Sequence, residues 1–351
     1  MEYSLNYLFL YLTWRCNLCC RHCWVSANSQ SDEVIKKEII TQAIEESATL
    51  GVKTIKISGG EPFLYPELVS EVARLCGKYS LGLNIESNGT LINQEVLAEF
   101  KGIPVYINIS LDSFDKDIHN SFRGDKNAFE RTMHGIVLLQ KQNIPFGITH
   151  TITEDNIAQL DELIYFLSIH NVSSLKLNPI LKIGRATDVD DEFPYLLSVE
   201  TYENIVKKYH CNEKNGVYVT TMVTPCFLSI PEMLTGKKRL YSCNFLNQLS
   251  ILPDGRAGLC GEAKDIDPFI FGNINTQTIQ EIWNESDSLN AFRYSMKKGM
   301  EGICGKCTFS DMCNGGCRIA SYLHGRKYNS ANPMADAYFS KHGSFPYRKG
   351  K

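Results

Sequence analysis

The sequence is poor in the features that mark nucleic-acid-binding, membrane and secreted proteins. Its 36 Lys and Arg against 39 Asp and Glu leave a formal net charge of −3, and there is no sustained basic run, so a nucleic-acid groove is not expected. No apolar stretch approaches the length of a membrane span. The first predicted strand begins almost at the N-terminus, so we expect no signal peptide.

Cysteine, in contrast, is abundant. Thirteen cysteines in a chain of 351 residues without a secretion signal indicate metal or redox chemistry in a reducing cytoplasm rather than disulfides. The length suits one large α/β domain with a smaller appended one, and 43% hydrophobic with 21% charged residues is an ordinary composition for a folded protein.

Three cysteines near the N-terminus form the motif C-x3-C-x2-C at Cys16, Cys20 and Cys23. A closed structural zinc site needs four ligands, whereas three thiolates on one loop suit a 4Fe–4S cluster with one open iron. An apolar run at 8–12 precedes the loop and a helical pattern follows it, which places the loop at the C-terminal end of a first strand. On spacing alone, buried free thiols or a partial zinc site stay open as alternatives.

Strand and helix patterns alternate through the first two thirds of the chain. We expect further strands over 52–57, 83–88, 105–112, 146–153 and 174–179, and helices over 33–50, 128–141 and 158–169. Six such units fit a partial (β/α)6, TIM-like barrel. Polar residues alternate with apolar ones along these strands, so the polar faces should point inward and line a wet ligand cavity; they include Lys56, Asn84, Glu86, Asn88, Asn108, Ser110, Asp112 and Asn178.

The C-terminal third is rich in short strands, turns and cysteines, and it follows a polar connector predicted over 184–194. Cys243 and Cys260 flank Gly255, and a C-x2-C-x5-C-x3-C motif comes later. That motif comprises Cys304, Cys307, Cys313 and Cys317. Two zinc ribbons would be the structural alternative, but this spacing is not typical of ribbons.

Together, C-x3-C-x2-C after a strand, Gly-Gly-Glu-Pro at 59–62 and the late cysteine pattern resemble the radical S-adenosylmethionine (SAM) enzymes of the peptide- and protein-maturase branch, which carry a C-terminal SPASM extension. The resemblance implies an α/β fold in which a partial barrel over 1–215 is followed by a small cysteine-rich α+β SPASM domain over 216–351. It also implies that the open iron binds the amino and carboxylate groups of SAM. Further SAM contacts would come from His22, Gly59, Gly60, Glu61, Pro62, Asn88, Ser110, Arg123 and Asn178.

The SAM contact expected of Arg123 also has a physical reason. Its planar guanidinium suits the SAM carboxylate because it can bind both oxygens at once. A surface ion pair is the alternative for this residue.

The SPASM resemblance also implies one or two auxiliary 4Fe–4S clusters. Cys243, Cys260 and Cys317 should hold the inner one, and Cys304, Cys307 and Cys313 the outer one. Cys226 is the best candidate for the fourth inner ligand, with a hydrogen-atom donor facing the substrate as the alternative.

No cysteine follows Cys317, so the outer cluster lacks the thiolate that SPASM domains usually supply from further downstream. Asp336 is adjacent to the vacant position and could ligate iron through oxygen, and a solvent molecule could take the position instead. Asp311, inside the cysteine motif, is a second candidate, followed by His324 and His342. The alternative is a smaller outer cluster or none.

In the mechanism implied by the resemblance, the reduced cluster cleaves SAM and the 5′-deoxyadenosyl radical removes a hydrogen atom from the substrate. We expect an oxidative crosslink or side-chain modification in a peptide or protein, with a donor such as flavodoxin or ferredoxin supplying electrons. A small-molecule dehydrogenase or epimerase is the alternative, because no leader-peptide-binding domain precedes the predicted barrel. A non-catalytic iron–sulfur or zinc scaffold is a further alternative.

Overall fold

The computed structural model describes residues 3–154, 156–187, 197–234 and 243–343. The chain divides into two compact units, each assembled from separate segments of sequence. Unit 1 comprises 1–149, 184–187 and 244–290, and unit 2 comprises 150–183, 188–243 and 291–351. The domain boundary expected at residue 215 stays a prediction.

Unit 1 is built on a sheet with the strand order β11-β10-β9-β1-β2-β3-β4-β5. Strands β1 to β5 are parallel, β9 is parallel to β1, and β10 and β11 are antiparallel additions. The strands are β1 Tyr7–Tyr11, β2 Thr54–Ser58, β3 Gly82–Ser87, β4 Val105–Ser110, β5 Phe146–Ile152, β9 Gln248–Ile251, β10 Arg256–Gly258 and β11 Ile270–Asn273.

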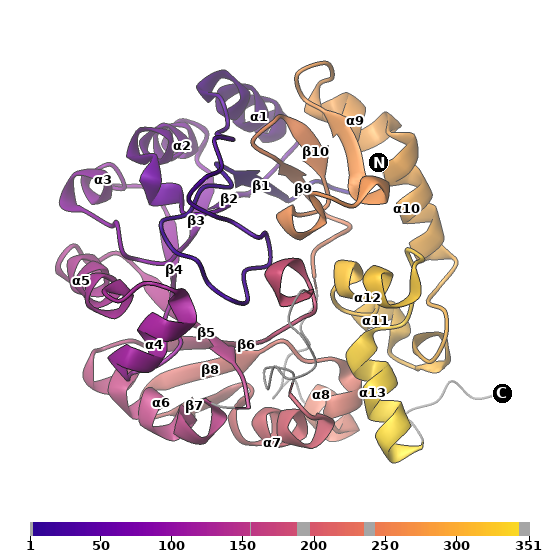
Figure 1. The fold of residues 1–351 in the computed structure, drawn as a ribbon. Coiled ribbons are helices and arrows are strands. Elements are labelled where there is room, and N and C mark those ends of the chain that lie inside the picture. Colours follow the sequence, from indigo (N-terminus) through magenta and orange to yellow (C-terminus); the bar gives the residue numbers. More distant parts are fainter. Residues whose placement is uncertain (1–2, 155, 188–196, 235–242, 344–351) are drawn as a thin grey trace. The chain divides into compact units, whose positions relative to one another are not determined.

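Helices cover the outer side of strands β1 to β4 in unit 1, as Figure 1 shows for α1, α2, α3 and α5. The apolar side chains of β2, β3 and β4, on the face opposite the polar one, are buried, in register with the alternation of the sequence. The helices are α1 Lys37–Thr49, α2 Pro66–Tyr79, α3 Gln94–Ala98, α4 Lys116–Arg123, α5 Ala128–Lys141, α9 Ile279–Glu285 and the start of α10 Asp287–Lys297.

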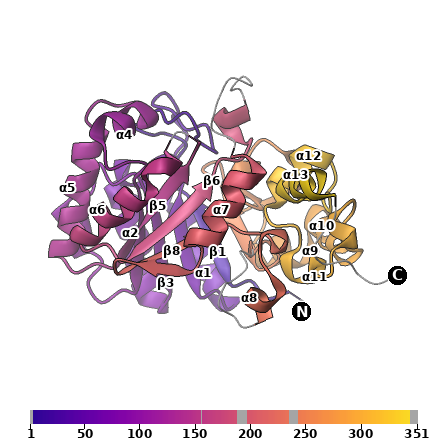
Figure 2. The same cartoon turned by 90° about the horizontal axis from the view of Figure 1, so that it is seen from below.

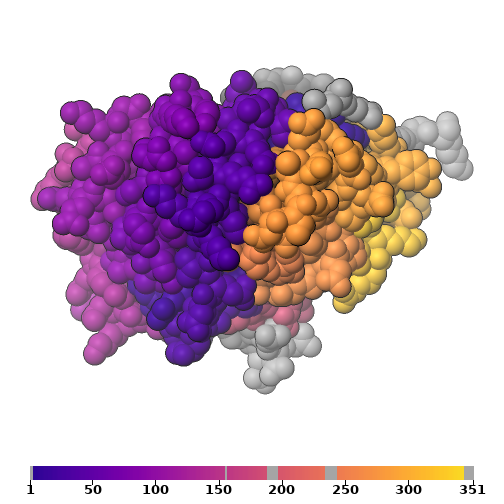
Figure 3. Space-filling model, turned by 90° about the horizontal axis from the view of Figure 1, so that it is seen from above, coloured from indigo at the N-terminus to yellow at the C-terminus, as the bar shows by residue number. Residues whose placement is uncertain are grey.

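The later segment of unit 1 packs against its N-terminal part. Strand β9 pairs with β1, and α9 packs on α1. Figure 3 shows the orange surface that includes this segment adjoining the indigo surface near the N-terminus. The sheet therefore continues beyond β1 because residues from the last third of the chain extend it.

Unit 2 has the strand order β6-β8-β7, with β6 parallel to β8 and β7 antiparallel to β8. Helices α12 and α13 pack against each other (Figure 2). The elements are β6 Ser174–Pro179, β7 Asn212–Lys214, β8 Val217–Thr221, α6 Leu160–Ile169, α7 Val199–Tyr209, α8 Ile230–Leu234, α11 Ser310–Cys313, α12 Arg318–Gly325 and α13 Pro333–His342.

The predicted alternation of strands and helices is confirmed through β6. The helix expected over 128–141 and the strand expected over 174–179 have the predicted limits, whereas β4 ends two residues early, at Ser110. Most of the predicted connector over 184–194 lies outside the described residues. In the described ranges, no helix is long and apolar enough to cross a membrane.

Candidate active site

The loop that carries the first three cysteines leaves β1 and is held by the end of β2. Gly60 N donates to Thr13 O at 2.6 Å, and Glu61 N donates to Arg15 O at 2.9 Å. A Cβ on Gly60 would lie 1.8 Å from Arg15 O, and Gly59 has φ +133°. Both glycines are therefore needed because the backbone of β2 lies directly against the segment that enters the loop.

Glu61 is fully buried and ties β2 to β3. Its carboxylate accepts hydrogen bonds from Ser87 Oγ (2.8 Å), Asn88 N (2.8 Å) and Phe63 N (3.1 Å). Burial raises the pKa of Glu61 to about 7, against the opposing effect of these donors. Pro62 begins the short 3-10 turn that follows. The SAM contact expected of this motif stays a prediction.

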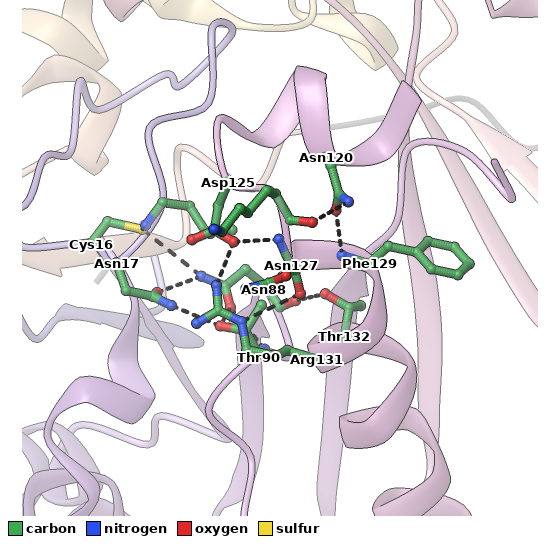
Figure 4. Close-up of polar contacts among 12 residues, drawn as sticks. Cys16, Asn17, Asn88, Thr90, Asn120, Asp125, Asn127, Phe129, Arg131 and Thr132 are labelled. Atoms are coloured by element: carbon green, nitrogen blue, oxygen red, sulfur yellow. Dashed lines mark hydrogen bonds and ion pairs between the residues drawn. The ribbon is translucent and has the colours of Figure 1, made fainter. Parts of the chain in front are cut away.

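Asn88 connects the end of β3 to the cysteine loop (Figure 4). Its Nδ2 donates to Asn17 Oδ1 at 3.0 Å and lies 3.9 Å from Cys16 Sγ. Asn17 Nδ2 in turn donates to Thr90 Oγ1 at 2.8 Å. Asn17 and Thr90 were not predicted as site residues, because their roles depend on contacts between residues over seventy positions apart.

Arg123, at the end of α4, contacts the same loop. Its Nε donates to the Asp112 carboxylate and its Nη1 lies 3.7 Å from Cys20 Sγ. Both side chains of the ion pair are buried, so the surface pair considered from the sequence is not what the structure contains. Gly124 adopts the left-handed conformation, and a Cβ there would meet the carbonyl of Cys19.

His22, which precedes the third cysteine, packs on α4. Its ring stacks on Phe122 with centroids 4.5 Å apart and an interplanar angle of 16°. Cys19 in the same loop is exposed. Cys19 is therefore accessible to solvent, whereas the His22 ring packs against α4, and the SAM contact expected of His22 stays a prediction.

A segment that the sequence did not single out also holds the loop. Arg185 Nε donates to Cys20 O at 2.9 Å, Arg185 Nη1 donates to Ala27 O at 2.5 Å, and Arg185 N donates to Cys23 O at 3.1 Å. The only available signal was the Gly184-Arg185 pair at the start of the predicted connector.

The environment of Cys16, Cys20 and Cys23 fits a cluster. Each sulfur lies close to an N–H donor, an arrangement that tunes iron–sulfur clusters. The pairs are Leu18 N to Cys16 (3.4 Å), Arg123 Nη1 to Cys20 (3.7 Å) and Ala27 N to Cys23 (3.4 Å).

Burial raises the pKa of Cys16 to about 12 and also raises that of Cys20, where Arg123 opposes the shift. Without metal these thiols are neutral, so binding iron would release protons. No group of three or more His, Cys, Asp or Glu side chains in the described ranges is arranged to hold one metal ion. A cubane differs from such a site because each thiolate binds a different iron.

Polar side chains of β2, β3 and β4 share the face predicted for them. Lys56 Nζ lies 2.8 Å from Glu86 Oε1, and Asn108 Nδ2 lies 3.5 Å from the same oxygen. Lys56 and Glu86 are about 28% and 29% exposed. Ser110 continues this face toward Asp112, as Glu86 continues toward Asn88, so the polar face is partly exposed at Lys56 and Glu86 and becomes buried at Asp112 and Asn88.

Unit 2 contains a second cysteine site. Cys304, Cys307 and Cys313 line one cavity with about 310 Å³ of atom-free space, part of it open to solvent. Cys226, on the 3-10 turn Pro225–Phe227, lines the same cavity. The structure therefore places Cys226 beside the predicted outer set, although the sequence analysis assigned it to the inner set.

The other predicted cluster and SAM ligands lie in both units. Cys243 and Cys317 lie near the buried Arg318 in unit 2, where they oppose the lowering of its pKa by burial. Cys260 precedes a 3-10 turn in unit 1, beside Tyr11. Asn178 is on β6, and Asp336 Oδ2 lies 2.7 Å from His324 Nε2. The inner-cluster ligands and the role of Asn178 stay predictions.

Residues 10–167 match the Radical SAM superfamily, and residues 243–308 match the SPASM iron-sulfur cluster-binding domain. The chain therefore contains a radical SAM domain and a SPASM domain. It is thus an enzyme that uses SAM and a 4Fe–4S cluster, with auxiliary iron–sulfur clusters bound by its SPASM domain.

Similar curated proteins include a heme synthase, a bacteriocin biosynthesis protein and a maturase. An AdoMet-dependent heme synthase of Methanosarcina barkeri is 25% identical over 92% of this chain and 93% of its own. The antilisterial bacteriocin subtilosin biosynthesis protein AlbA of Bacillus subtilis is 26% identical over 92% of this chain and 68% of its own. The mycofactocin maturase MftC of Mycobacterium tuberculosis is 26% identical over 92% and 80%, respectively.

Solved structures agree on the fold. Native anSMEcpe with bound AdoMet and Cp18Cys peptide has a TM-score of 0.73 at 20% identity, covering 95% of this chain and 96% of that one. Streptococcus suis SuiB bound to precursor peptide SuiA has a TM-score of 0.74 at 16% identity, covering 95% and 76%. The predicted α/β radical SAM fold with a cysteine-rich SPASM domain is confirmed.

Proposed function

We propose that this radical SAM enzyme modifies a side chain of a peptide or protein, forming a crosslink or oxidising a residue. The observation that carries the proposal is the polar face of β2 to β4, which is partly exposed at Lys56 and Glu86. Lys56, Glu86 and Asn108 present a cation, a carboxylate and an amide. These groups can pair with the N–H and C=O groups of an extended peptide, which must find partners when they leave water.

Cys16, Cys20 and Cys23 would hold the catalytic cluster. When bound, the cluster and SAM supply a radical able to remove a hydrogen atom from an unactivated carbon. The protein fixes the loop from three directions: the end of β2 at Gly60, α4 at Arg123 and the turn at Arg185. Such preorganisation keeps the reacting groups in one geometry.

Named relatives support a peptide substrate. AlbA takes part in subtilosin biosynthesis, MftC is a maturase, and anSMEcpe and SuiB were solved with peptides. An electron donor such as flavodoxin or ferredoxin would complete the system. We also propose a reducing, cytoplasmic location, because none of the thirteen cysteines, all of them described, forms a disulfide.

A second candidate is a tetrapyrrole substrate. The heme synthase of Methanosarcina barkeri matches this chain over nearly the full length of both proteins, and a Fe-coproporphyrin III synthase of the same organism is 27% identical. The polar face argues against it, because a flat macrocycle buries two broad apolar faces and small-molecule pockets are usually lined by apolar side chains.

The test supplies the reconstituted, reduced full-length protein with SAM and either iron coproporphyrin III or a peptide encoded beside its gene. We expect peptide-dependent formation of 5′-deoxyadenosine, with loss of hydrogen from the peptide by mass spectrometry. Glu86→Gln and Lys56→Met should weaken that reaction more than SAM cleavage without substrate. Turnover of the porphyrin in place of the peptide would establish the second candidate.

A further inference from the structure

The outer auxiliary site contains four sulfurs, not three. Cys226, Cys304, Cys307 and Cys313 line one cavity in unit 2, and each side chain is at most 7% exposed. The four come from three short elements: the 3-10 turn Pro225–Phe227, the 3-10 turn Cys304–Lys306 with the residue after it, and α11. Four cysteine thiolates are the usual complete ligand set of a 4Fe–4S cluster.

Polar groups around the cavity point at these sulfurs. Asn332 N donates to Cys304 Sγ at 3.4 Å, and Thr224 Oγ1 lies 3.1 Å from Cys226 Sγ. Asn332 Nδ2 also donates to Gly315 O at 2.9 Å, which anchors the loop after Cys313. Hydrogen bonds to the sulfurs and to the ligand loops are the outer-shell interactions that orient cluster ligands.

Apolar side chains pack around two of the four cysteines. Cys226 and Cys304 belong to one buried group with Ala331 and Ala335, and Phe227, Met300 and Tyr338 are among the side chains packed against it. These side chains leave Cys226 and Cys304 at most 7% exposed. The buried Cys226 thiol lines the same cavity as the other three sulfurs.

The aspartate expected at this site is engaged elsewhere. Asp336 Oδ2 lies 2.7 Å from His324 Nε2, the Asp336 side chain is 37% exposed, and it does not line the cavity. Residues 318–351 contain no cysteine. The fourth sulfur at the cavity comes instead from a segment about eighty residues before the motif.

We propose that Cys226 is the fourth ligand of the outer auxiliary cluster, which is a closed four-cysteine 4Fe–4S cluster. Cys226 thus replaces both the aspartate ligand and the hydrogen-atom donor considered from the sequence. With a protein thiolate on every iron, this cluster has no position for substrate and serves electron transfer. The assignment concerns ligands alone and does not depend on which substrate the enzyme modifies.

The test uses full-length protein carrying Cys16→Ala, Cys20→Ala and Cys23→Ala, so that only auxiliary iron is counted. Iron and sulfide per chain are measured after anaerobic reconstitution in this background and after adding Cys226→Ala, Asp336→Ala or the control Cys211→Ala. We expect Cys226→Ala to remove about four irons per chain, and Asp336→Ala and Cys211→Ala to remove none. Cys211 is a thiol of the same unit that does not line the cavity.

A second variant guards against a simple failure to fold. Cys226→Ser keeps the size of the side chain and offers an oxygen ligand, so we expect the EPR spectrum of the reduced protein to change in one auxiliary signal only. Full iron content with an unchanged spectrum in both Cys226 variants would overturn the proposal. Loss of the same iron in Asp336→Ala, or equal loss in Cys211→Ala, would overturn it as well.

Discussion

Arg123 and Asp112 form an ion pair that is almost completely inaccessible to water, and the same guanidinium reaches the sulfur of Cys20. Asp112 follows the end of β4 and Arg123 is the last residue of α4, so the ion pair joins the two ends of the β4–α4 segment. Burial raises the pKa of the Cys20 thiol, and the Arg123 guanidinium opposes this shift, whereas Asp112 adds to it.

Removing only one member of this pair should be costly. We expect Arg123→Ala to lower the free energy of unfolding by about 3–5 kcal/mol, because it leaves the Asp112 carboxylate buried without its partner. Urea denaturation measures the loss. The double variant Arg123→Ala, Asp112→Ala should lose less than the sum of the two single variants, and simple additivity would contradict the coupling.

The first three cysteines should be separable from the auxiliary sites. Changing Cys16, Cys20 and Cys23 together to Ala should abolish 5′-deoxyadenosine formation while auxiliary iron remains. Cys19→Ala is the matched control, because this exposed thiol lies in the same loop and should leave activity unchanged. Continued SAM cleavage by the triple variant would show that the catalytic cluster is held elsewhere.

Glu61 should make stability depend on pH. Its pKa rises from 4.5 to about 7 on folding, so the folded state binds the proton more tightly than the unfolded state between these values. The contribution of Glu61 to the free energy of unfolding is fully present below about pH 4.5. It is lost as the pH rises toward 7, a decrease of roughly 3 kcal/mol in total.

Denaturation of the metal-free protein at a series of pH values measures this effect. Glu61→Gln cannot titrate, so its stability should fall less than that of the wild type between pH 5 and 7. Parallel pH profiles for the two proteins would show that Glu61 does not carry the dependence.

Substitution by alanine should have opposite effects at Gly60 and Gly77. Gly60→Ala would put a Cβ 1.8 Å from Arg15 O, so the chain entering the cysteine loop must shift, and we expect reduced iron in the catalytic site. Gly77→Ala, in α2, meets only Ile103 at ordinary contact distance and should stabilise the protein by about 0.5–1 kcal/mol. Iron content and thermal unfolding of both variants measure the contrast.

Arg185 should matter to the catalytic cluster although it contributes no metal ligand. Arg185→Ala removes charged hydrogen bonds to the carbonyls of Cys20 and Ala27, each worth roughly 1.5–3 kcal/mol when intact. We expect the catalytic iron to be lost faster to a chelator, whereas Arg15→Ala, with an exposed side chain, should behave as the wild type. Equal rates in both variants would rule out this role.

The local parts of the fold could be read from the sequence. Alternation of apolar residues located β4, β5 and β6, and helical spacing gave the limits of α5, because burial of one face imposes a repeat on neighbouring residues. The cysteine motifs were equally visible, since the ligands of one cluster lie close together in sequence at both C-x3-C-x2-C and C-x2-C-x5-C-x3-C.

The contacts that complete the sites were not visible in this way. Arg185 reaches the first cysteine loop from 165 positions away in sequence, and Cys226 lies about eighty positions before the sulfurs it joins. The sequence alone determined the class of enzyme, its cofactors and the cysteines that lie within one motif. Only the tertiary structure decided which distant side chains meet these cysteines. Folding brings together residues that are far apart in sequence, and no local pattern of residues records such contacts.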